Sequence, residues 1–139
     1  MSDLLKLVEG EFRSSCPLCC ALDLLGDKWS LIILRDMLFF KKRQYQEFLE
    51  SSEAISTNIL SNRLKRLEEL KLIDKRMYQT NPKRYEYKPT NAAEELRQPI
   101  LVLMQWSLAN VKGMRVSTEK IEQMVGGVAQ RKANLNADK

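Results

Sequence analysis

The chain has 139 residues, of which 44% are hydrophobic and 29% are charged, a composition typical of a single folded domain with a buried core. Lys and Arg number 23 against 18 for Asp and Glu, so the net charge is +5, which favours a polyanionic partner. The chain contains no histidine, and this absence removes the commonest general base, the commonest metal ligand and every Ser-His or Cys-His nucleophile. We therefore expect neither enzyme activity nor a cofactor.

The amino terminus lacks a basic region followed by an apolar run and a small-residue cleavage site, so we expect no secretory signal. Every apolar run is far shorter than the roughly 20 residues that a membrane-spanning helix requires. Cys16, Cys19 and Cys20 form a tight group, unlike the even, widely spaced cysteines of a disulfide-framed secreted domain. These features predict a cytoplasmic protein without a membrane partner.

Two helices are expected in the first part of the chain. The first covers Cys16 to Leu25, with Pro17 in its first turn and Gly26 at its end. Asp27 is suited to cap the second helix, in which helical spacing is shown by Trp29, Ile32, Ile33, Asp36 and Met37. Additional leucines widen its apolar side, so this helix should be buried on most sides.

A second pair of helices follows a break at Lys41 to Arg43. The spacing of Tyr45, Phe48 and Leu49 predicts a short amphipathic helix. Ser56 is positioned to cap a longer helix, Thr57 to Leu70, whose apolar stripe consists of Leu60, Leu64, Leu67 and Leu70. Because the connection is short, the pair has the form of a helix-turn-helix.

A hairpin and a further helix complete the expected architecture. Leu72–Gln79 and Arg84–Lys88 are strand-prone segments on either side of a turn at residues 80–83. Thr90 is suited to cap a long helix that Pro99 should kink or restart. The apolar residues of this helix are too numerous for a solvent-facing element: Leu96, Ile100, Leu103, Met104, Trp106 and Leu108.

The order of these elements predicts a mainly α (α+β) fold, a winged helix-turn-helix with a two-stranded wing. We expect a single domain over residues 1–139, with the winged helix-turn-helix core at about residues 16–110. One more helix is expected from Ser117 to Val125, within a tail, residues 114–139, to which the sequence assigns no role.

The polar face of the Ser56–Leu70 helix has the residue types that read DNA. Opposite its leucine stripe, helical periodicity places Asn58, Ser61, Asn62, Lys65 and Arg66. Asn pairs with adenine, Arg with guanine, and hydroxyl groups bind bases or phosphates. Ser56 and Thr57 belong to the amino-terminal turn, which usually lies deepest in the major groove. Because surface helices generally have a polar outer face, this face alone does not indicate DNA binding. The evidence for DNA binding comes from the neighbouring elements of the chain.

Basic residues are concentrated in one part of the chain: Lys41, Lys42, Arg43, Arg63, Lys65, Arg66, Lys71, Lys75, Arg76, Lys83 and Arg84. Lys83 and Arg84, with two more cations in the same hairpin, lie where a wing contacts phosphate, although lysines also prevent pairing between exposed strand edges. Arg43 precedes the helix-turn-helix, close to the expected path of the DNA backbone, but a solvated loop explains this charge run equally well.

Several short motifs occur in a specific order: Cys16-Pro17, residues 21–29 with Gly26-Asp27-Lys28-Trp29, Ile33 to Arg35, Ile55-Ser56, Leu60, Arg63-Leu64, Leu67-Glu68, Tyr78, Pro82 to Tyr87, Thr90, Pro99 and Trp106. From Cys16 to Trp106 the chain thereby resembles the HxlR family of bacterial winged-helix transcription regulators. It departs from the family pattern at four positions. Lys71 stands where Gly is usual and Gln44 where a basic residue is frequent, while Pro89 replaces Leu and Ala93 replaces Gly.

This resemblance implies sequence-specific binding of double-stranded DNA by a homodimer, in which the first and last helices of the subunits pack together. A two-fold dimer requires a pseudo-palindromic operator with half-sites about 10 base pairs, or a multiple of that, apart. We expect the protein to repress transcription rather than activate it. The resemblance does not identify a small-molecule effector. Cys16 aligns with a cysteine that several members use to sense oxidants or electrophiles, which makes it a redox-sensing candidate.

Other functions remain open at this point. A winged helix can also serve as a protein-interaction module without sequence-specific DNA binding, with its basic face on an acidic partner. Cys16 and Cys19 form a C-x-x-C pair, but the βαβ setting of a thiol redox enzyme is missing. Three cysteines fall short of the four ligands of a structural zinc site, so we expect no metal, and Cys19 and Cys20 are better explained as small buried hydrophobes.

Overall fold

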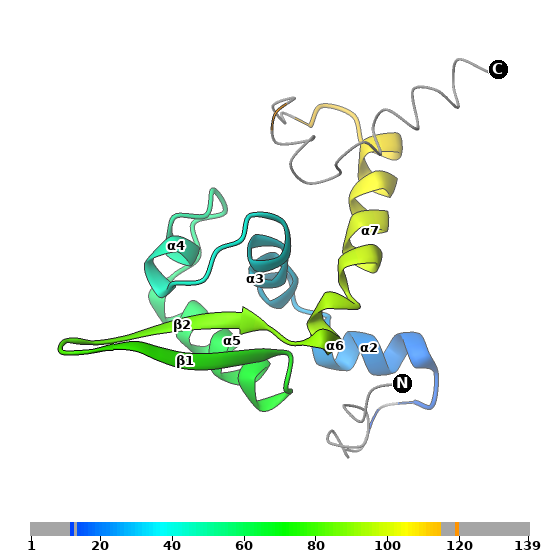
Figure 1. Ribbon diagram of the computed structural model, residues 1–139. Coiled ribbons are helices and arrows are strands. Elements are labelled where there is room, and N and C mark those ends of the chain that lie inside the picture. The colour runs from blue at the N-terminus through cyan, green and yellow to red at the C-terminus, as the bar shows by residue number, and fades with distance from the viewer. Residues whose placement is uncertain (1–11, 13, 115–118, 120–139) are drawn as a thin grey trace. The chain divides into compact units, whose positions relative to one another are not determined.

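The computed structural model describes residues 12, 14–114 and 119 (Figure 1). The first unit of the chain ends at Leu96 and contains α2 (Pro17–Leu25), α3 (Lys28–Phe39), α4 (Tyr45–Leu49), α5 (Thr57–Glu69), β1 (Ile73–Thr80), β2 (Lys83–Pro89) and α6 (Asn91–Glu94). The second unit begins at Arg97 and contains α7 (Arg97–Asn110). No helix in the described ranges is long and apolar enough to cross a membrane. The helix expected from Ser117 to Val125 lies outside the described residues, apart from Glu119.

The boundary between α2 and α3 depends on Gly26 and Asp27, as the sequence predicted. The N–H of Gly26 donates to the carbonyl oxygen of Leu22 at 2.7 Å. A Cβ atom at position 26 would lie 2.3 Å from that same oxygen, so this close approach requires glycine. The Asp27 carboxylate then caps α3 by accepting hydrogen bonds from the backbone N–H and the hydroxyl of Ser30, at 3.0 and 2.7 Å.

The hydrophobic core of the first unit is formed where α3, α4, α5 and the base of the hairpin meet. Its buried side chains include Ile33, Leu34, Met37, Leu38, Phe48, Leu60, Leu64, Leu67, Leu72, Ile73 and Tyr87. Phe48 and Tyr87 meet edge to face, with ring centroids 6.4 Å apart. The predicted leucine stripe of α5 is thus confirmed as its core-facing side, and the opposite side of the helix is left to solvent.

A buried carboxylate connects α3 to the segments on both sides of α4. Asp36 is only 1% exposed, and its oxygens accept hydrogen bonds from Arg35, Lys42 and the hydroxyl of Ser51. Arg35 also donates two hydrogen bonds, 3.0 and 2.7 Å long, to Glu53 in the turn between α4 and α5. A buried charge is tolerated when its lone pairs are satisfied in this way. The network therefore fixes the turn of the helix-turn-helix against α3.

A second carboxylate, that of Asp27, connects α3 to α5. Besides capping α3, it accepts a hydrogen bond from Nε of Arg63 at 2.7 Å, and Nη1 of Arg66 lies 3.9 Å away. Burial raises the pKa of Asp27, but the hydrogen bonds from Arg63 and Ser30 and the attraction to Arg63 outweigh burial and hold it below its ordinary value. One side chain thus fixes the start of α3 and the middle of α5 together.

The hairpin is antiparallel and contains one irregularity. Met77 pairs with Tyr85 and Gln79 with Arg84, so Tyr78 is the extra residue of a β-bulge. At the other end, the N–H of Tyr87 donates to the carbonyl of Arg43 at 2.7 Å, and Gln44 pairs with Glu86 as an isolated bridge. The strands predicted from the sequence are confirmed to within one residue at each end.

The long helix expected after Thr90 consists of two helices. Thr90 caps α6 by accepting a hydrogen bond from the N–H of Ala93, and its hydroxyl also lies 2.8 Å from the carbonyl oxygen of Lys71. α6 ends at Glu94, and α7 begins at Arg97 with Pro99 in its first turn. Of the two outcomes expected of Pro99, the structure shows the restart, because proline is compatible with a first turn.

The Arg35–Glu53 ion pair predicts a specific acid sensitivity. The hydrogen bonds from Arg35 lower the pKa of Glu53 from 4.5 to about 2. Since the folded pKa is depressed, the ion pair contributes fully above about pH 4.5, and its contribution is lost as the pH falls toward 2. Urea unfolding at several pH values should show a weaker decline in this window for Glu53→Gln than for the original chain. Glu50→Gln is the control, and equal pH profiles for all three proteins would contradict the prediction.

The contact between Asp27 and Arg63 predicts a loss of stability with a matching change in pKa. Arg63→Met keeps an apolar stem but removes the guanidinium, so the free energy of unfolding should fall by about 1–2 kcal/mol. The pKa of Asp27, measured by NMR titration, should rise toward its ordinary value. Lys65→Met, an exposed change on the same helix, should alter stability by less than about 0.5 kcal/mol. An unchanged Asp27 titration in Arg63→Met would show that this hydrogen bond does not form in solution.

Candidate nucleic-acid interface

The exposed face of α5 contains most of the residues predicted to read DNA. Asn58, Ser61, Asn62 and Lys65 are exposed on the side away from the leucine stripe, and Thr57 is exposed in the first turn of the helix. Ser56 precedes them as the N-cap, with its hydroxyl accepting the N–H of Ile59 at 3.2 Å. The capping hydroxyl is therefore occupied by the helix itself, while the residues that follow it present their side chains to solvent.

α4 fixes the amino-terminal half of α5 through one tyrosine. The Tyr45 hydroxyl donates to the carbonyl oxygen of Thr57, 3.1 Å away, and lies 3.1 Å from the hydroxyl of Ser61. This role of Tyr45 was not predicted, because its spacing with Phe48 indicated only a core-facing position. The bond holds the turns of α5 that bear the exposed polar residues.

The two asparagines of the face differ in their freedom to pair with a base. Bidentate pairing with adenine needs both the oxygen and the nitrogen of the amide. The amide oxygen of Asn62 accepts a hydrogen bond from Arg63, whereas the Asn58 side chain makes no hydrogen bond with any described residue. Both ends of the Asn58 amide are therefore without a partner among the described residues, whereas the amide oxygen of Asn62 is already used by Arg63.

Two arginines predicted to contact DNA are turned toward the protein. Nη2 of Arg66 donates to the carbonyl oxygen of Asp23 at 2.8 Å, which connects α5 to α2. Nη1 of Arg43 donates to the carbonyl oxygens of Met37 and Lys42, both at 2.8 Å. Carbonyl groups at a helix end lack intrahelical partners, so they attract such donors. Both guanidinium groups therefore make internal hydrogen bonds, and the Arg66 side chain is still 39% exposed.

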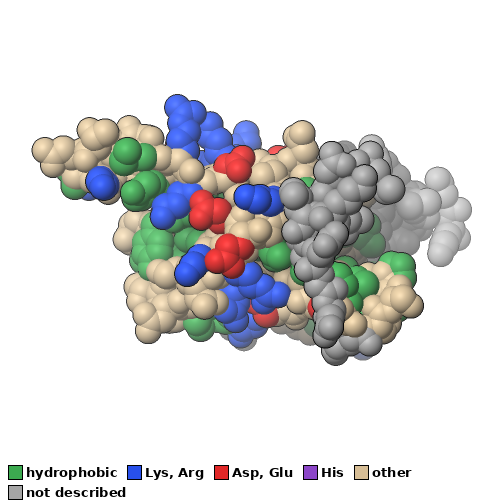
Figure 2. Space-filling model, turned by 90° about the horizontal axis from the view of Figure 1, so that it is seen from below, with side chains coloured by type: hydrophobic (Ala, Val, Ile, Leu, Met, Phe, Trp, Pro, Cys, Tyr) green, Lys and Arg blue, Asp and Glu red, His purple; other side chains and the backbone are tan. Residues whose placement is uncertain are grey.

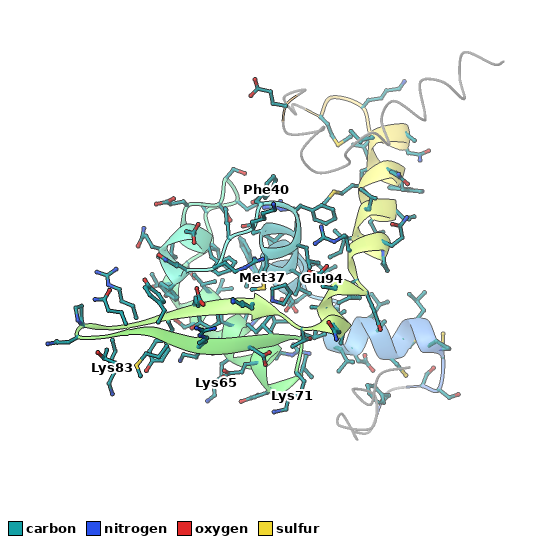
Figure 3. The ribbon with its side chains drawn as sticks, in the orientation of Figure 1. Met37, Phe40, Lys65, Lys71, Lys83 and Glu94 are labelled. Atoms are coloured by element: carbon teal, nitrogen blue, oxygen red, sulfur yellow. The ribbon has the colours of Figure 1, made fainter. Side chains whose placement is uncertain are left out.

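The wing places cations on the same side as α5. Lys83 and Arg84 are exposed at the start of β2, and neither forms an ion pair with a described residue. Figure 2 shows Lys and Arg side chains gathered on the side of the first unit that is seen from below, with a few acidic side chains among them. Lys65, Lys71 and Lys83 all lie toward this side (Figure 3). The helix and the wing therefore share one mainly positive surface.

The three cysteines lie at the start of α2, which precedes the helix-turn-helix and the wing in the sequence. Cys16 is the exposed N-cap of α2, and Cys20 donates from its thiol to the Ser14 carbonyl oxygen at 3.4 Å. Hydrogen bonds from the backbone N–H groups of Cys19 and Leu18 lower the pKa of Cys16, slightly opposed by desolvation. The nearby cation Lys28 is not among these causes, and its ammonium lies over the ring of Trp29.

Known proteins with similar sequences are transcription regulators. An uncharacterized HTH-type transcriptional regulator of Mycobacterium tuberculosis is 41% identical over 106 residues, which are 76% of this chain and 63% of the relative. A second, from Synechocystis, is 37% identical over 89 residues, 64% of each chain. This chain thus spans less than two thirds of the length of these relatives.

Solved structures share the fold. The redox regulator HypR in its oxidized form has a TM-score of 0.63 and 25% identity, covering 70% of this chain and 100% of that chain. The reduced form of the regulator YodB from B. subtilis has a TM-score of 0.58 and 22% identity, covering 73% and 100%, and this similarity concerns the fold alone. Residues 24–115 match the family described as HxlR-like helix-turn-helix. The winged helix-turn-helix prediction is confirmed, and the chain belongs to the HxlR-like helix-turn-helix family.

Proposed function

We propose that this protein is a cytoplasmic transcription regulator that binds a specific DNA sequence through α5 and the wing. The observation that carries the proposal is the exposed polar face of α5, held in place by Asp27 on one side and Tyr45 on the other. A recognition helix must be rigid and must present donors and acceptors that the protein does not use itself. Asn58 and Lys65 meet both conditions, whereas the Ser61 hydroxyl already contacts the hydroxyl of Tyr45.

Within this proposal, the residues have different roles. Asn58 and Asn62 read base edges in the major groove, and Thr57 and Ser61 bind base edges or phosphates. Lys65, Lys83 and Arg84 bind phosphates, which supplies affinity for DNA of any sequence. Arg66 and Arg43 support the structure instead, as their internal hydrogen bonds indicate.

We also propose that the DNA-binding form is a homodimer that represses transcription by occupying a pseudo-palindromic operator. Leu18 and Leu22 of α2 are 66% and 48% exposed, and Trp106 of α7 is 61% exposed. Exposed apolar patches of this kind indicate a surface that a partner covers. A two-fold pair of chains would bury these side chains and place two α5 helices on successive major grooves.

DNA binding can be tested with operator fragments selected from genomic DNA. Fluorescence anisotropy should show affinity falling steeply as salt rises, because bound phosphates release counterions. Asn58→Ala should weaken binding to the selected fragment by about 1–3 kcal/mol with little effect on random DNA. Lys83→Ala should weaken binding to both kinds of DNA alike. Salt-independent binding, or equal displacement by operator and random DNA, would favour the alternative of a protein-interaction module.

A second proposal concerns control of this activity by thiol chemistry at Cys16. Its exposed thiol and lowered pKa give Cys16 a larger share of the reactive thiolate than an ordinary cysteine has. Diamide treatment should release the operator from the original chain but not from Cys16→Ser, while Cys19→Ser should respond like the original. Alkylation of Cys16 by iodoacetamide should have its midpoint at a lower pH than alkylation of an ordinary cysteine thiol, measured on free cysteine under the same conditions. Equal release of operator by oxidant from Cys16→Ser and the original chain would eliminate this role.

A further inference from the structure

A hollow between the wing and α4 is not explained by DNA binding. Its volume is about 330 Å³, at the lower end of the range for small-molecule sites. It lies entirely within the first unit, and its residues come from the hairpin and from the amino-terminal part of the helix-turn-helix: Gln44, Tyr45, Gln46, Tyr78, Lys83, Arg84, Tyr85 and Tyr87. The hollow thus combines aromatic rings, amides and cations.

Two of the tyrosines form a fixed part of this lining. Tyr87 is buried and packs edge-on against Phe48. Tyr45 is held by its hydroxyl, which contacts Thr57 and Ser61 of α5. Side chains fixed by packing and hydrogen bonds keep the same geometry with and without a ligand, which lowers the entropic cost of binding.

The other two tyrosines are exposed aromatic residues on the wing. Tyr78 and Tyr85 are 41% and 37% exposed. Tyr78 is the extra residue of the bulge between Met77 and Gln79, and a bulge changes the direction of a side chain relative to a regular strand. A tyrosine can bind phosphate through its hydroxyl group, but that contact does not use the faces of the ring, so phosphate binding does not account for these aromatic surfaces.

The charge of the hollow defines the chemistry of its occupant. Lys83 and Arg84 both line it, and none of its lining residues is acidic. Arg binds carboxylates through two parallel hydrogen bonds, and Lys adds a point charge. Aromatic rings, in turn, stack on planar rings. The lining therefore matches a small molecule that is flat at one end and anionic at the other.

We propose that this hollow binds a planar aromatic carboxylate, with its ring among the tyrosines and its carboxylate on Arg84 and Lys83. Because the proposed function uses the same two cations to bind phosphate, the ligand competes with DNA and releases the operator. This competition rests on the proposed function, whereas binding of the ligand itself does not. The wing is then both a DNA contact and the site at which a small molecule weakens that contact.

Isothermal titration calorimetry without DNA tests the site directly, with 2-naphthoate as the probe. Saturable binding is expected, while 2-naphthamide, which lacks the charge, and cyclohexanecarboxylate, which lacks the aromatic ring, should each bind at least about tenfold more weakly. Arg84→Gln and Tyr78→Ala should each reduce 2-naphthoate affinity by about tenfold. Arg76→Gln is the matched control, because Arg76 lies on the same hairpin but does not line the hollow. No binding at millimolar probe, or equal binding by all variants, would overturn the site.

Competition is then measured by fluorescence anisotropy with labelled operator. Saturating 2-naphthoate should raise the apparent Kd for operator by about tenfold or more, and Tyr78→Ala should bind operator but lose this response. An operator affinity that is unchanged by saturating 2-naphthoate would overturn the competition. Failure of the chain to bind DNA without the probe would instead refute the proposed function, and the calorimetric result would still stand.

Discussion

The position of the proposed reading helix depends on one carboxylate. Asp27 begins α3 by capping its first turn and accepts a hydrogen bond from Arg63 in the middle of α5. Each contact would be modest by itself, since a net hydrogen bond contributes about 1 kcal/mol and a charged one about twice that. Their value lies in sharing one side chain, because α5 cannot rotate about its axis without withdrawing Arg63 from the start of α3. The exposed face of α5 therefore has one orientation relative to the core.

The local sequence was sufficient to predict the helices and strands and most residues on the exposed face of α5. Ser56 and the leucine stripe gave the start and the buried side of α5, and once the buried side is known the opposite side follows from helical geometry. Asp27 as a cap and Gly26 as a stop were equally local signals, because each acts on backbone groups within four residues. The hairpin was found for the same reason, with two strand-prone runs separated by a turn.

Contacts between residues far apart in the chain were not accessible from sequence. Arg66 has the residue type and the helical position of a DNA contact, yet its Nη2 donates to the carbonyl oxygen of Asp23, 43 residues earlier in the chain. The direction of a long charged side chain depends on which unsatisfied acceptors lie within its reach, and only the tertiary structure places them. The bulge at Tyr78 was not predicted for a related reason. A bulge depends on how the residues of two strands pair, whereas strand propensity is a property of each strand alone.

Lys71 differs from the usual family residue in two properties, its backbone conformational preference and its charge. It follows α5 with φ near +61°, the left-handed region that favours glycine, and the family resemblance indicates glycine as the usual residue here. A lysine in this conformation costs about 1–2 kcal/mol of backbone strain but adds a cation at the carboxyl end of the helix. That charge lies toward the same side as Lys65 and Lys83. The field of an exposed charge extends about 8 Å at physiological salt, so we expect this lysine to act mainly on the rate at which a polyanion approaches, before any hydrogen bond forms.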